Sequence, residues 1–554
     1  MHTFINHLKT NWQAGLTVAL ISVPLSLALS IASGAGPMPG IITGVWATLI
    51  ASVFASSNYN IIGPAGALAT VLFAATIAPQ FGVGAAILPL IAIGVGIAIF
   101  VVFALKADRF LYYVPASIIH GFSAGVAVLI ASSQLFDGAG LALKRTGHFI
   151  GDLELFGAHI RDVNPYAVGT FVIFLTFILL WKRYIKSIPA VIPAALLGMG
   201  FGYIATLTQL PVTTLLEKFG TLSGTLYLGF DMSALTAIMS SHASIIAYIK
   251  VVLLVAAIAI LETLITAKVG DKMTRTQCSP RKELFGLALA NIGSGFMGGL
   301  PATGVFLRTG ANIKAGATHR TAAGVSAVAT ALIAVVALPF FVYLPAAVIA
   351  AMLINTAIGL IEMGTFKEYW KRDKQSFGIA ILVAVITIVE DPGLAVLAGV
   401  MVALLVYVDR VSRGHSRLTY NFKDGTTKEV VVAKGIAVPE KPVDLAVYSI
   451  AGTVSYISAP QHSTNLRKLM RTEHVRAIAV RLRDCYALDL DAVEMLEEIA
   501  HEARLAHKKI YFTSVNDEVR AELMKFPTLA LLLNKETSFT KTSDLVQSLK
   551  TRTI

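Results

Sequence analysis

The chain has 554 residues, of which 55% are hydrophobic and 14% are charged, and its mean hydropathy is +0.72. An ordinary soluble domain carries about 25% charged residues, so this composition does not fit a soluble globular protein and predicts a polytopic membrane protein. The net charge of +12 does not indicate a nucleic-acid partner, because the cationic residues lie in short loops between apolar segments, where they set membrane topology.

Apolar segments that could cross a bilayer, or reach halfway across it, follow one another from the N-terminus. We predict about 14 of them, at roughly 14–33, 41–54, 61–77, 84–105, 113–135, 166–181, 189–207, 246–267, 284–299, 303–315, 321–342, 344–360, 376–390 and 392–408. They divide into two sets of seven, and the second set is predicted to repeat the first in inverted orientation. Most Lys and Arg residues of the loops fall on the side of the N-terminus, which predicts cytoplasmic N- and C-termini.

The C-terminal part of the chain has a different character. Hydrophobicity falls after Arg410, and the polar residues 411–440 predict a linker with room for a short hairpin. Strand-like and helix-like patterns then alternate, at 445–450, 459–471, 477–482, 489–506, 509–513 and 516–525. This alternation predicts a small α/β domain. The predicted divisions are a transmembrane domain at 1–410, the linker at 411–440 and a cytoplasmic domain at 441–554.

Two short stretches, Asn60–Thr70 and Gly299–Thr309, are built alike and occupy the third place in each set of seven. Each is a Gly/Pro break followed by a small-residue helical start. Paired breaks of this kind indicate the binding site of a transporter with inverted repeats. Two helix starts that face each other would direct free N–H groups and positive dipole ends at one point, which is a site for an anion.

Ionisable side chains are scarce in the predicted spans, and Glu262, Arg308 and His120 are the examples. Glu262 shares a helix face with Thr266, four residues later, so it could exchange a proton or hold Na⁺ together with Thr266. The alternative is that Glu262 pairs with Arg308 for packing alone. Arg308 could instead face the anion, or extend to the cytoplasmic interface. His120 is more typical of a packing residue than of a proton relay.

The sequence contains no P-loop, no cluster of metal-ligating His and Cys residues and no nucleophile elbow. We therefore expect no enzymatic activity, no cofactor and no bound metal.

The runs Ala14–Ala28, Ile62–Ala67 and Pro301–Asn312 resemble the SulP family, the sulfate-permease-type anion transporters related to pendrin and prestin. The C-terminal part resembles the cytoplasmic STAS domain of that family. The resemblance implies a core of spans 1–4 and 8–11 that moves, elevator-like, against a gate of spans 5–7 and 12–14. It also implies a homodimer, with the anion between the starts of spans 3 and 10.

The resemblance assigns site residues position by position. The span-3 motif falls on Gly63, Pro64, Ala65, Gly66 and Ala67, the span-10 motif on Thr303, Gly304, Val305, Phe306 and Arg308, and the span-8 carboxylate on Glu262. Leu25 stands where many members have Gln, which removes a polar contact. The sodium-dependent bicarbonate members have Asp at the Glu262 position and Thr at the Phe306 position. Since Phe306 cannot ligate an ion, proton coupling is favoured over sodium coupling.

These features together predict a secondary active transporter of a small anion, of the sulfate, bicarbonate or dicarboxylate class, coupled to protons through Glu262. We expect it in a bacterial inner membrane, with an unidentified cytoplasmic partner for the STAS domain. The alternatives are a sodium-coupled bicarbonate symporter, a nucleobase–proton symporter of similar topology, a sensor or scaffold, and a passive anion channel. A nucleobase symporter is expected to carry a second carboxylate on span 10, where this chain has Arg308 and no acid.

Overall fold

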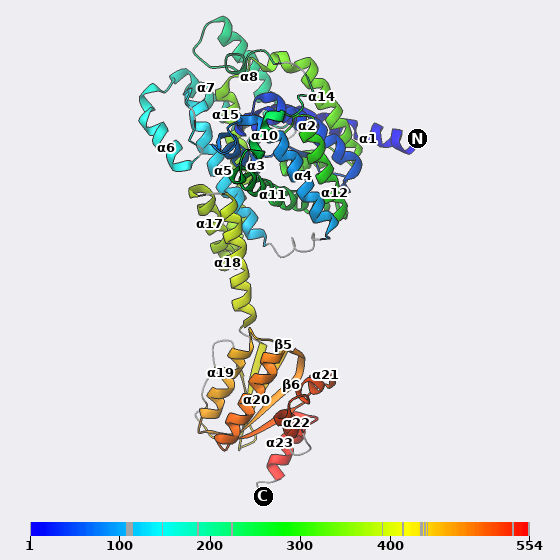
Figure 1. Ribbon diagram of the computed structural model, residues 1–554, viewed down its shortest axis with the longest axis vertical. Helices are drawn as coiled ribbons and strands as arrows, with labels where there is room; N and C mark the ends of the chain where they lie inside the picture. Colours follow the sequence, from blue (N-terminus) through cyan, green and yellow to red (C-terminus); the bar gives the residue numbers. More distant parts are fainter. Residues whose placement is uncertain are drawn as a thin grey trace. The chain divides into compact units, whose positions relative to one another are not determined.

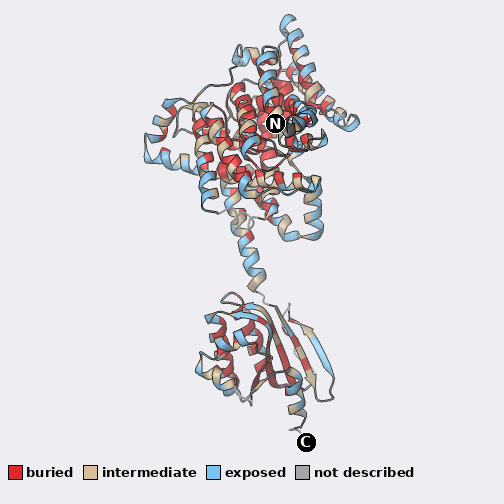
Figure 2. Cartoon of the chain, turned by 90° about the vertical axis from the view of Figure 1, so that its right-hand side faces the viewer, coloured by how far each residue is buried: buried red, intermediate tan, exposed pale blue. Residues whose placement is uncertain are grey.

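The computed structural model describes residues 2–106, 115–143, 145–146, 148–185, 188–222, 225–390, 392–412, 415–432, 436, 439, 441–533 and 537–551. The chain forms two compact units, Met1–Met401 and Val402–Ile554 (Figure 1). In each unit the buried residues fill the interior and the exposed residues lie on the outside (Figure 2).

The first unit is helical. Its helices are α1 (His2–Ala32), α2 (Pro37–Phe54), α3 (Gly66–Ile77), α4 (Leu88–Ala104), α5 (Ala116–Ala139), α6 (Phe149–Ala158), α7 (Pro165–Tyr184), α8 (Val191–Leu207), α9 (Leu215–Phe219), α10 (Met232–Met239), α11 (His242–Thr274), α12 (Pro280–Phe296), α13 (Phe306–Lys314), α14 (Thr321–Phe341), α15 (Ala346–Leu360), α16 (Met363–Arg372), α17 (Lys374–Val389) and α18 (Pro392–Ser412). The last of these, α18, continues into the second unit.

A helix overlaps each of the predicted apolar segments. Within the described residues, nine helices are long and apolar enough to cross a membrane, and α3, α8 and α17 are shorter apolar helices. The prediction of a helical membrane protein is therefore confirmed, whereas the number of crossings and their inverted repeat stay predictions. Part of the span predicted at 113–135 lies outside the described residues, and α5 begins after Pro115, whose ring fits the start of a helix.

The helices of the first unit pack in two groups. One group contains α1, α2, α3, α4, α11, α12, α13 and α14, and the other contains α5, α7, α8, α15 and α17. Glycines allow close approach inside each group: a Cβ on Gly96 would lie 2.7 Å from the Ala288 carbonyl oxygen, and one on Gly125 would lie 2.5 Å from Cβ of Thr387. The two groups meet where α3 packs on α5 and where α1 packs on α8 and α15.

The second unit contains a six-stranded sheet of order β4-β3-β5-β6-β7-β8. The strands are β3 (His415–Phe422), β4 (Thr427–Val431), β5 (Val443–Val454), β6 (Val475–Leu488), β7 (Lys509–Thr513) and β8 (Ser538–Phe539), and the helices are α19 (Ala459–Arg471), α20 (Leu490–Leu505), α21 (Asp517–Leu523), α22 (Pro527–Leu532) and α23 (Thr542–Thr551). Strands β5 to β8 pair in parallel, and β3 pairs antiparallel with both β4 and β5.

The segment 411–440, predicted as a linker with room for a short hairpin, contains such a hairpin, and the hairpin is part of the sheet. The described residues of this segment include β3 and β4, which extend the sheet beyond β5. Leu418 and Tyr420 alternate with polar residues along β3 and are buried, which is the pattern of a strand with one face on a core. Gly425 has φ +83° in the turn, a conformation that glycine adopts without strain. The abundance of polar residues in the hairpin concealed this period-two pattern; residues 413–414, 433–435, 437–438 and 440 lie outside the described residues.

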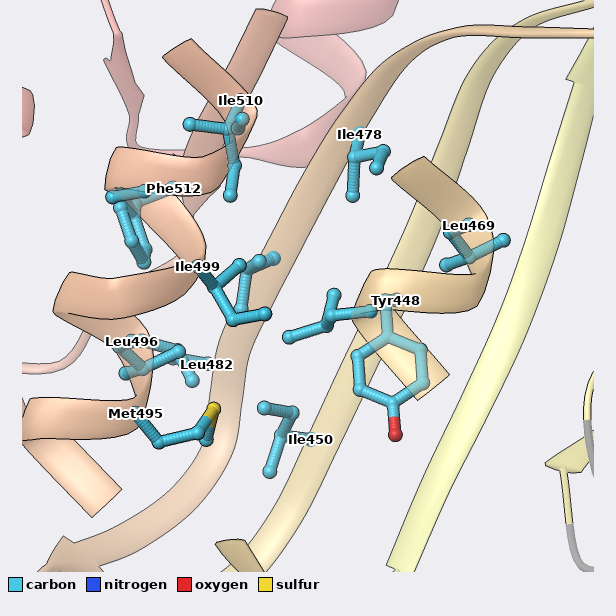
Figure 3. Packing of buried hydrophobic residues seen from close by; sticks show 14 of the residues in the cluster. Tyr448, Ile450, Leu469, Ile478, Leu482, Met495, Leu496, Ile499, Ile510 and Phe512 are labelled. Carbon is cyan, nitrogen blue, oxygen red and sulfur yellow. The ribbon is translucent and has the colours of Figure 1, made fainter. Parts of the chain in front are cut away.

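One face of the sheet is covered by α19 and α20. Tyr448 and Ile478 from the strands pack with Leu469 of α19 and Leu496 and Ile499 of α20 (Figure 3). Each such side chain contributes roughly 1.5–3 kcal/mol when it is fully buried. A second cluster on the opposite face joins strand residues to Leu545 of α23. The C-terminal unit therefore has a hydrophobic core of its own, as expected for a separate α/β domain.

Candidate functional site

Two short strands bring the predicted breaks together. Strand β1 (Ile62–Gly63) pairs antiparallel with β2 (Thr303–Gly304), so that Ile62 lies opposite Gly304 and Gly63 opposite Thr303. Each strand leads within three residues into a helix, β1 into α3 and β2 into α13. The preceding residues, Ala65 and Val305, are extended, and no side chain caps either helix. The first N–H groups of both helices thus start beside one another without side-chain caps.

Side chains from neighbouring helices hold the place where β1 pairs with β2, which is called the crossing from here on. The Thr48 hydroxyl group donates to the Ile62 carbonyl oxygen at 2.5 Å. Thr263 accepts from the Gly304 N–H group at 2.8 Å, and Thr266 donates to the Gly304 carbonyl oxygen at 3.2 Å. Thr266, which we had considered as an ion ligand, therefore holds the backbone of β2. The main chain at the crossing is rigidly placed although it lies outside any helix.

Arg308 lies in the first turn of α13 and is fully buried, with 0% of its surface exposed. Its Nη2 donates to the Ser26 hydroxyl oxygen at 3.1 Å, whereas Nε and Nη1 have no hydrogen-bond partner. Among the described residues, no ion pair includes Arg308. The alternative that Arg308 extends to the interface is excluded by its burial. A buried cation without a counter-charge is costly, so this site fits a bound anion.

Glu262 lies on α11 and lines a small cavity, of about 30 Å³, between the two helix groups. Ala67 of α3 shares this cavity, and Ile118, Phe122 and Ser123 of α5 line its other side. The Oε2 atom of Glu262 is buried without a hydrogen-bond partner. The described part of the chain shows no ion pair between Glu262 and Arg308, so the alternative of a packing pair is not supported.

The structure places the other predicted residues around this centre. The Thr303 hydroxyl group donates to the Ala259 carbonyl oxygen at 3.0 Å and lies 3.0 Å from the Thr263 hydroxyl oxygen, which connects β2 with α11, the helix that carries Glu262. Phe306 is 50% exposed at the start of α13, whereas Leu25 is buried on α1. The remaining motif residues Pro64, Ala65 and Gly66 are buried between β1 and α3. His120 lies elsewhere, with Nδ1 3.5 Å from a carboxylate oxygen of Glu362.

Several residues of the site were missed in the sequence analysis because only ionisable side chains inside the predicted spans were considered, and Glu283 lies just before the span predicted at 284–299. Asn291 of α12 accepts from the Ala302 N–H group at 2.8 Å and donates to the Ala302 carbonyl oxygen at 3.0 Å, which holds the chain just before β2. Ser26, Asn60 and Glu283 also contact the crossing or its approach. Polar residues in apolar spans were the available signal. Among the residues that the structure describes, no group of three or more His, Cys, Asp or Glu side chains could hold a metal ion.

The chain is similar in sequence to proteins of a known family. The profile of the Sulfate permease family matches residues 8–383. The chain belongs to the sulfate permease family. A Bacillus subtilis (strain 168) member named "Putative sulfate transporter YvdB" is 27% identical over 523 residues, which cover 92% of each chain. The bicarbonate transporter BicA of Picosynechococcus sp. (strain ATCC 27264 / PCC 7002 / PR-6) is 25% identical, over 92% of this chain and 89% of BicA.

Solved structures of this fold extend the comparison. The murine Solute Carrier 26 family member A9 (Slc26a9) anion transporter in the inward-facing state has a TM-score of 0.79 at 12% identity, over 98% of this chain and 92% of that chain. The transmembrane domain of a cyanobacterium bicarbonate transporter BicA has a TM-score of 0.61 at 23% identity, over 72% of this chain and 97% of that chain. The predicted membership of the sulfate permease family is confirmed, and this protein is an integral membrane protein of a family of transporters, not enzymes. The identity of the C-terminal unit as a STAS domain stays a prediction.

Proposed function

We propose that this sulfate permease family member is a secondary active transporter of a small oxyanion, of the sulfate, bicarbonate or dicarboxylate class. The observation that carries the proposal is the meeting of two uncapped helix starts beside the buried guanidinium group of Arg308, which keeps two donors free. Backbone N–H groups and positive helix ends bind anions without further side chains. The helix α13 carries Arg308 and no acid, which favours an anion over a nucleobase.

The proposed mechanism is elevator-like alternating access. The group that contains α11 and α13 acts as the core and the group that contains α5 as the gate. The antiparallel pairing of β1 with β2, each followed by a short helix, is what two inverted repeats would produce, and it supports the 14-segment scheme. The anion would travel with the core, since both helix starts belong to it.

We propose that protons drive uptake through Glu262. This carboxyl group lines the cavity between core and gate, and one of its oxygen atoms has no partner, so a proton is a suitable ligand. Sodium coupling is the alternative, because a bicarbonate transporter is among the relatives. Against it, the Thr266 hydroxyl group is already bonded to the Gly304 carbonyl oxygen, and Phe306 offers no ligand.

We also propose the cellular setting that the sequence predicts. The protein would lie in a bacterial inner membrane as a homodimer, with both termini in the cytoplasm. The C-terminal unit acts as a STAS domain that binds an unidentified cytoplasmic partner.

Uptake into proteoliposomes tests the proposal. Labelled sulfate, bicarbonate and succinate would each be offered under an imposed proton gradient and, separately, under a sodium gradient. Uptake of one of them that a protonophore abolishes supports proton-coupled transport and identifies the substrate class. A requirement for sodium would replace protons with sodium as the coupling ion. Labelled uracil serves as the comparison, and uptake of uracil alone would contradict an anion substrate.

A further inference from the structure

Glu283 is a fully buried carboxylate at the start of α12 that contacts the approach to β1. Its Oε2 accepts from the N–H groups of Ser56 and Ser57, at 3.0 and 2.9 Å, and from the Ser56 hydroxyl group at 3.1 Å. Its Oε1 accepts from Nδ2 of Asn60 at 2.8 Å. Glu283 is 0% exposed and belongs to no ion pair among the described residues. Hydrogen bonds to an ionised acceptor are about twice as strong as neutral ones, so these donors are firmly held.

The hydrogen bonds continue from Asn60 into the second break. The Asn60 Oδ1 atom accepts from the Thr309 hydroxyl group at 3.1 Å, and the same hydroxyl oxygen accepts from the Ile61 N–H group at 3.0 Å. Thr309 follows Arg308 directly on α13. Two side chains, Asn60 and Thr309, thus connect Glu283 with the helix that carries the buried guanidinium group.

Each group in this series has a fixed role. An ionised carboxylate accepts only, so Glu283 requires the amide nitrogen of Asn60 on its side and leaves the amide oxygen for Thr309. The amide group of Asn60 lies close against Gly304 of β2, where an added Cβ would be 2.9 Å from both of its terminal atoms, and its Nδ2 also donates to the Thr263 carbonyl oxygen at 3.5 Å. Asn60 is therefore held in one orientation between β2 and the carboxylate.

We infer that Glu283 is a positioning residue for the anion site: by orienting Asn60, and through it Thr309, it sets how β1 and β2 face each other. The expected effect of Glu283 on anion affinity rests on the proposed function, whereas its expected effect on the backbone of the crossing does not. Glu283 itself does not touch the anion in this arrangement.

Glu283→Gln is the first variant. The new amide group at position 283 carries N–H donors, and these would face the N–H groups of Ser56 and Ser57 or the amide nitrogen of Asn60. One of the hydrogen bonds between position 283 and these groups is therefore lost or reversed in direction. Adding Asn60→Asp to this variant restores a donor–acceptor pair between positions 283 and 60. The amide nitrogen at position 283 then donates to the carboxylate at position 60, and this carboxylate still accepts from the Thr309 hydroxyl group. Glu217→Gln, at an exposed position of α9, is the matched control.

Hydrogen–deuterium exchange of the full-length protein gives a readout that requires no transport. We expect exchange in peptides covering 59–67 and 303–310 to rise about tenfold in Glu283→Gln and to return to the wild-type rate in Glu283→Gln/Asn60→Asp. Unchanged exchange in the single variant, or no recovery in the double variant, would overturn the inference. If Glu283→Gln does not fold, Thr309→Val removes the hydroxyl link instead, and unchanged exchange in that variant has the same meaning.

Anion uptake adds the functional readout. We expect the KM for the transported anion to rise about tenfold in the single variant while the maximal rate per folded protein changes little. A KM that stays at the wild-type value despite faster exchange would overturn the role in anion affinity. Wild-type protein that shows the expected exchange pattern but takes up no anion would count against the proposed function and still support the positioning of the crossing.

Discussion

The guanidinium group of Arg308 occupies the space that a side chain at position 63 would need, because a Cβ on Gly63 would lie 2.5 Å from Nη1 of Arg308. Gly63 belongs to β1 and Arg308 to α13, so the two breaks are complementary in shape as well as in hydrogen bonding. The absence of a side chain at Gly63 is therefore a requirement of the buried cation.

Gly63→Ala should displace the Arg308 side chain and weaken anion binding about tenfold or more, since even a shift of about 1 Å in a charged group is costly at a preorganised site. Uptake at varied anion concentrations measures the KM. The control is Gly310→Ala, on the same helix as Arg308, where an added Cβ meets nothing within 4 Å. Equal KM values for the two variants would remove Gly63 from the site.

Arg308→Met should abolish saturable anion uptake without destabilising the protein. The variant removes a buried charge that has no ion-pair partner among the described residues, and because an uncompensated buried charge is costly, an apolar side chain of similar length should not lower the stability. Thermal unfolding in detergent measures stability, and anion-induced shifts of the midpoint measure binding. Arg372→Met, at an exposed position, is the control. A midpoint that still rises with added anion in Arg308→Met would contradict the proposed site.

Glu262→Gln should remove uptake driven by a proton gradient but leave anion exchange across the membrane at equal pH. The amide keeps the size of the side chain, yet it cannot take up and release a proton at physiological pH. Counterflow and gradient-driven uptake measure the two activities separately. The control is Glu368→Gln on α16, where the carboxylate is exposed. Gradient-driven uptake at the wild-type rate in Glu262→Gln would exclude Glu262 as the coupling group.

Acid should destabilise the C-terminal unit through His462. Burial lowers the pKa of His462 to about 4 from its ordinary value of 6.5, and its Nδ1 lies 2.9 Å from the Tyr448 hydroxyl oxygen. The unfolded chain therefore binds a proton that the folded domain does not bind between pH 6.5 and about 4. The free energy of unfolding falls as the pH is lowered through this range, by up to roughly 3 kcal/mol.

Urea unfolding at a series of pH values, followed by the fluorescence of tyrosines in the C-terminal unit, measures this slope. His462→Gln should flatten it, whereas His501→Gln, at an exposed position of α20, should leave it unchanged. A slope that persists in His462→Gln would assign the acid sensitivity to other groups.

The sequence predicted the architecture of the breaks because glycine and proline leave a strong local signal. The Gly/Pro steps at Gly63 and Pro301 end the apolar pattern at matching places, and the structure has β1 and β2 there. The positions of the apolar helices were predictable for the same reason, since length and hydropathy determine them. The structure pairs Gly63 with Thr303, as an inverted repeat would, while the repeat itself stays a prediction.

The hydrogen-bonded support of the crossing could not be predicted from local pattern. Glu283 and Asn60 are 223 positions apart in sequence, and the residues around each of them do not indicate that the two side chains form a hydrogen bond. Glu283 resembles an ordinary acidic residue in the first turn of a helix, where the helix dipole favours it. Similarly, the β3–β4 hairpin is polar enough to resemble a linker, and only its pairing with β5 makes it part of a sheet.

The pairing of β1 with β2 is made by main-chain groups, and it has a consequence for how the gene can vary. Substitutions that keep glycine at positions 63 and 304 leave the peptide groups in place, so they should often be compatible with transport. Insertion or deletion of one codon between β2 and Arg308 would instead rotate the guanidinium group by about 100° around α13, away from Gly63 and Ser26. The length of these few residues is thus more tightly constrained than their identity, and a library of codon insertions and deletions would locate the transport site without knowledge of the substrate.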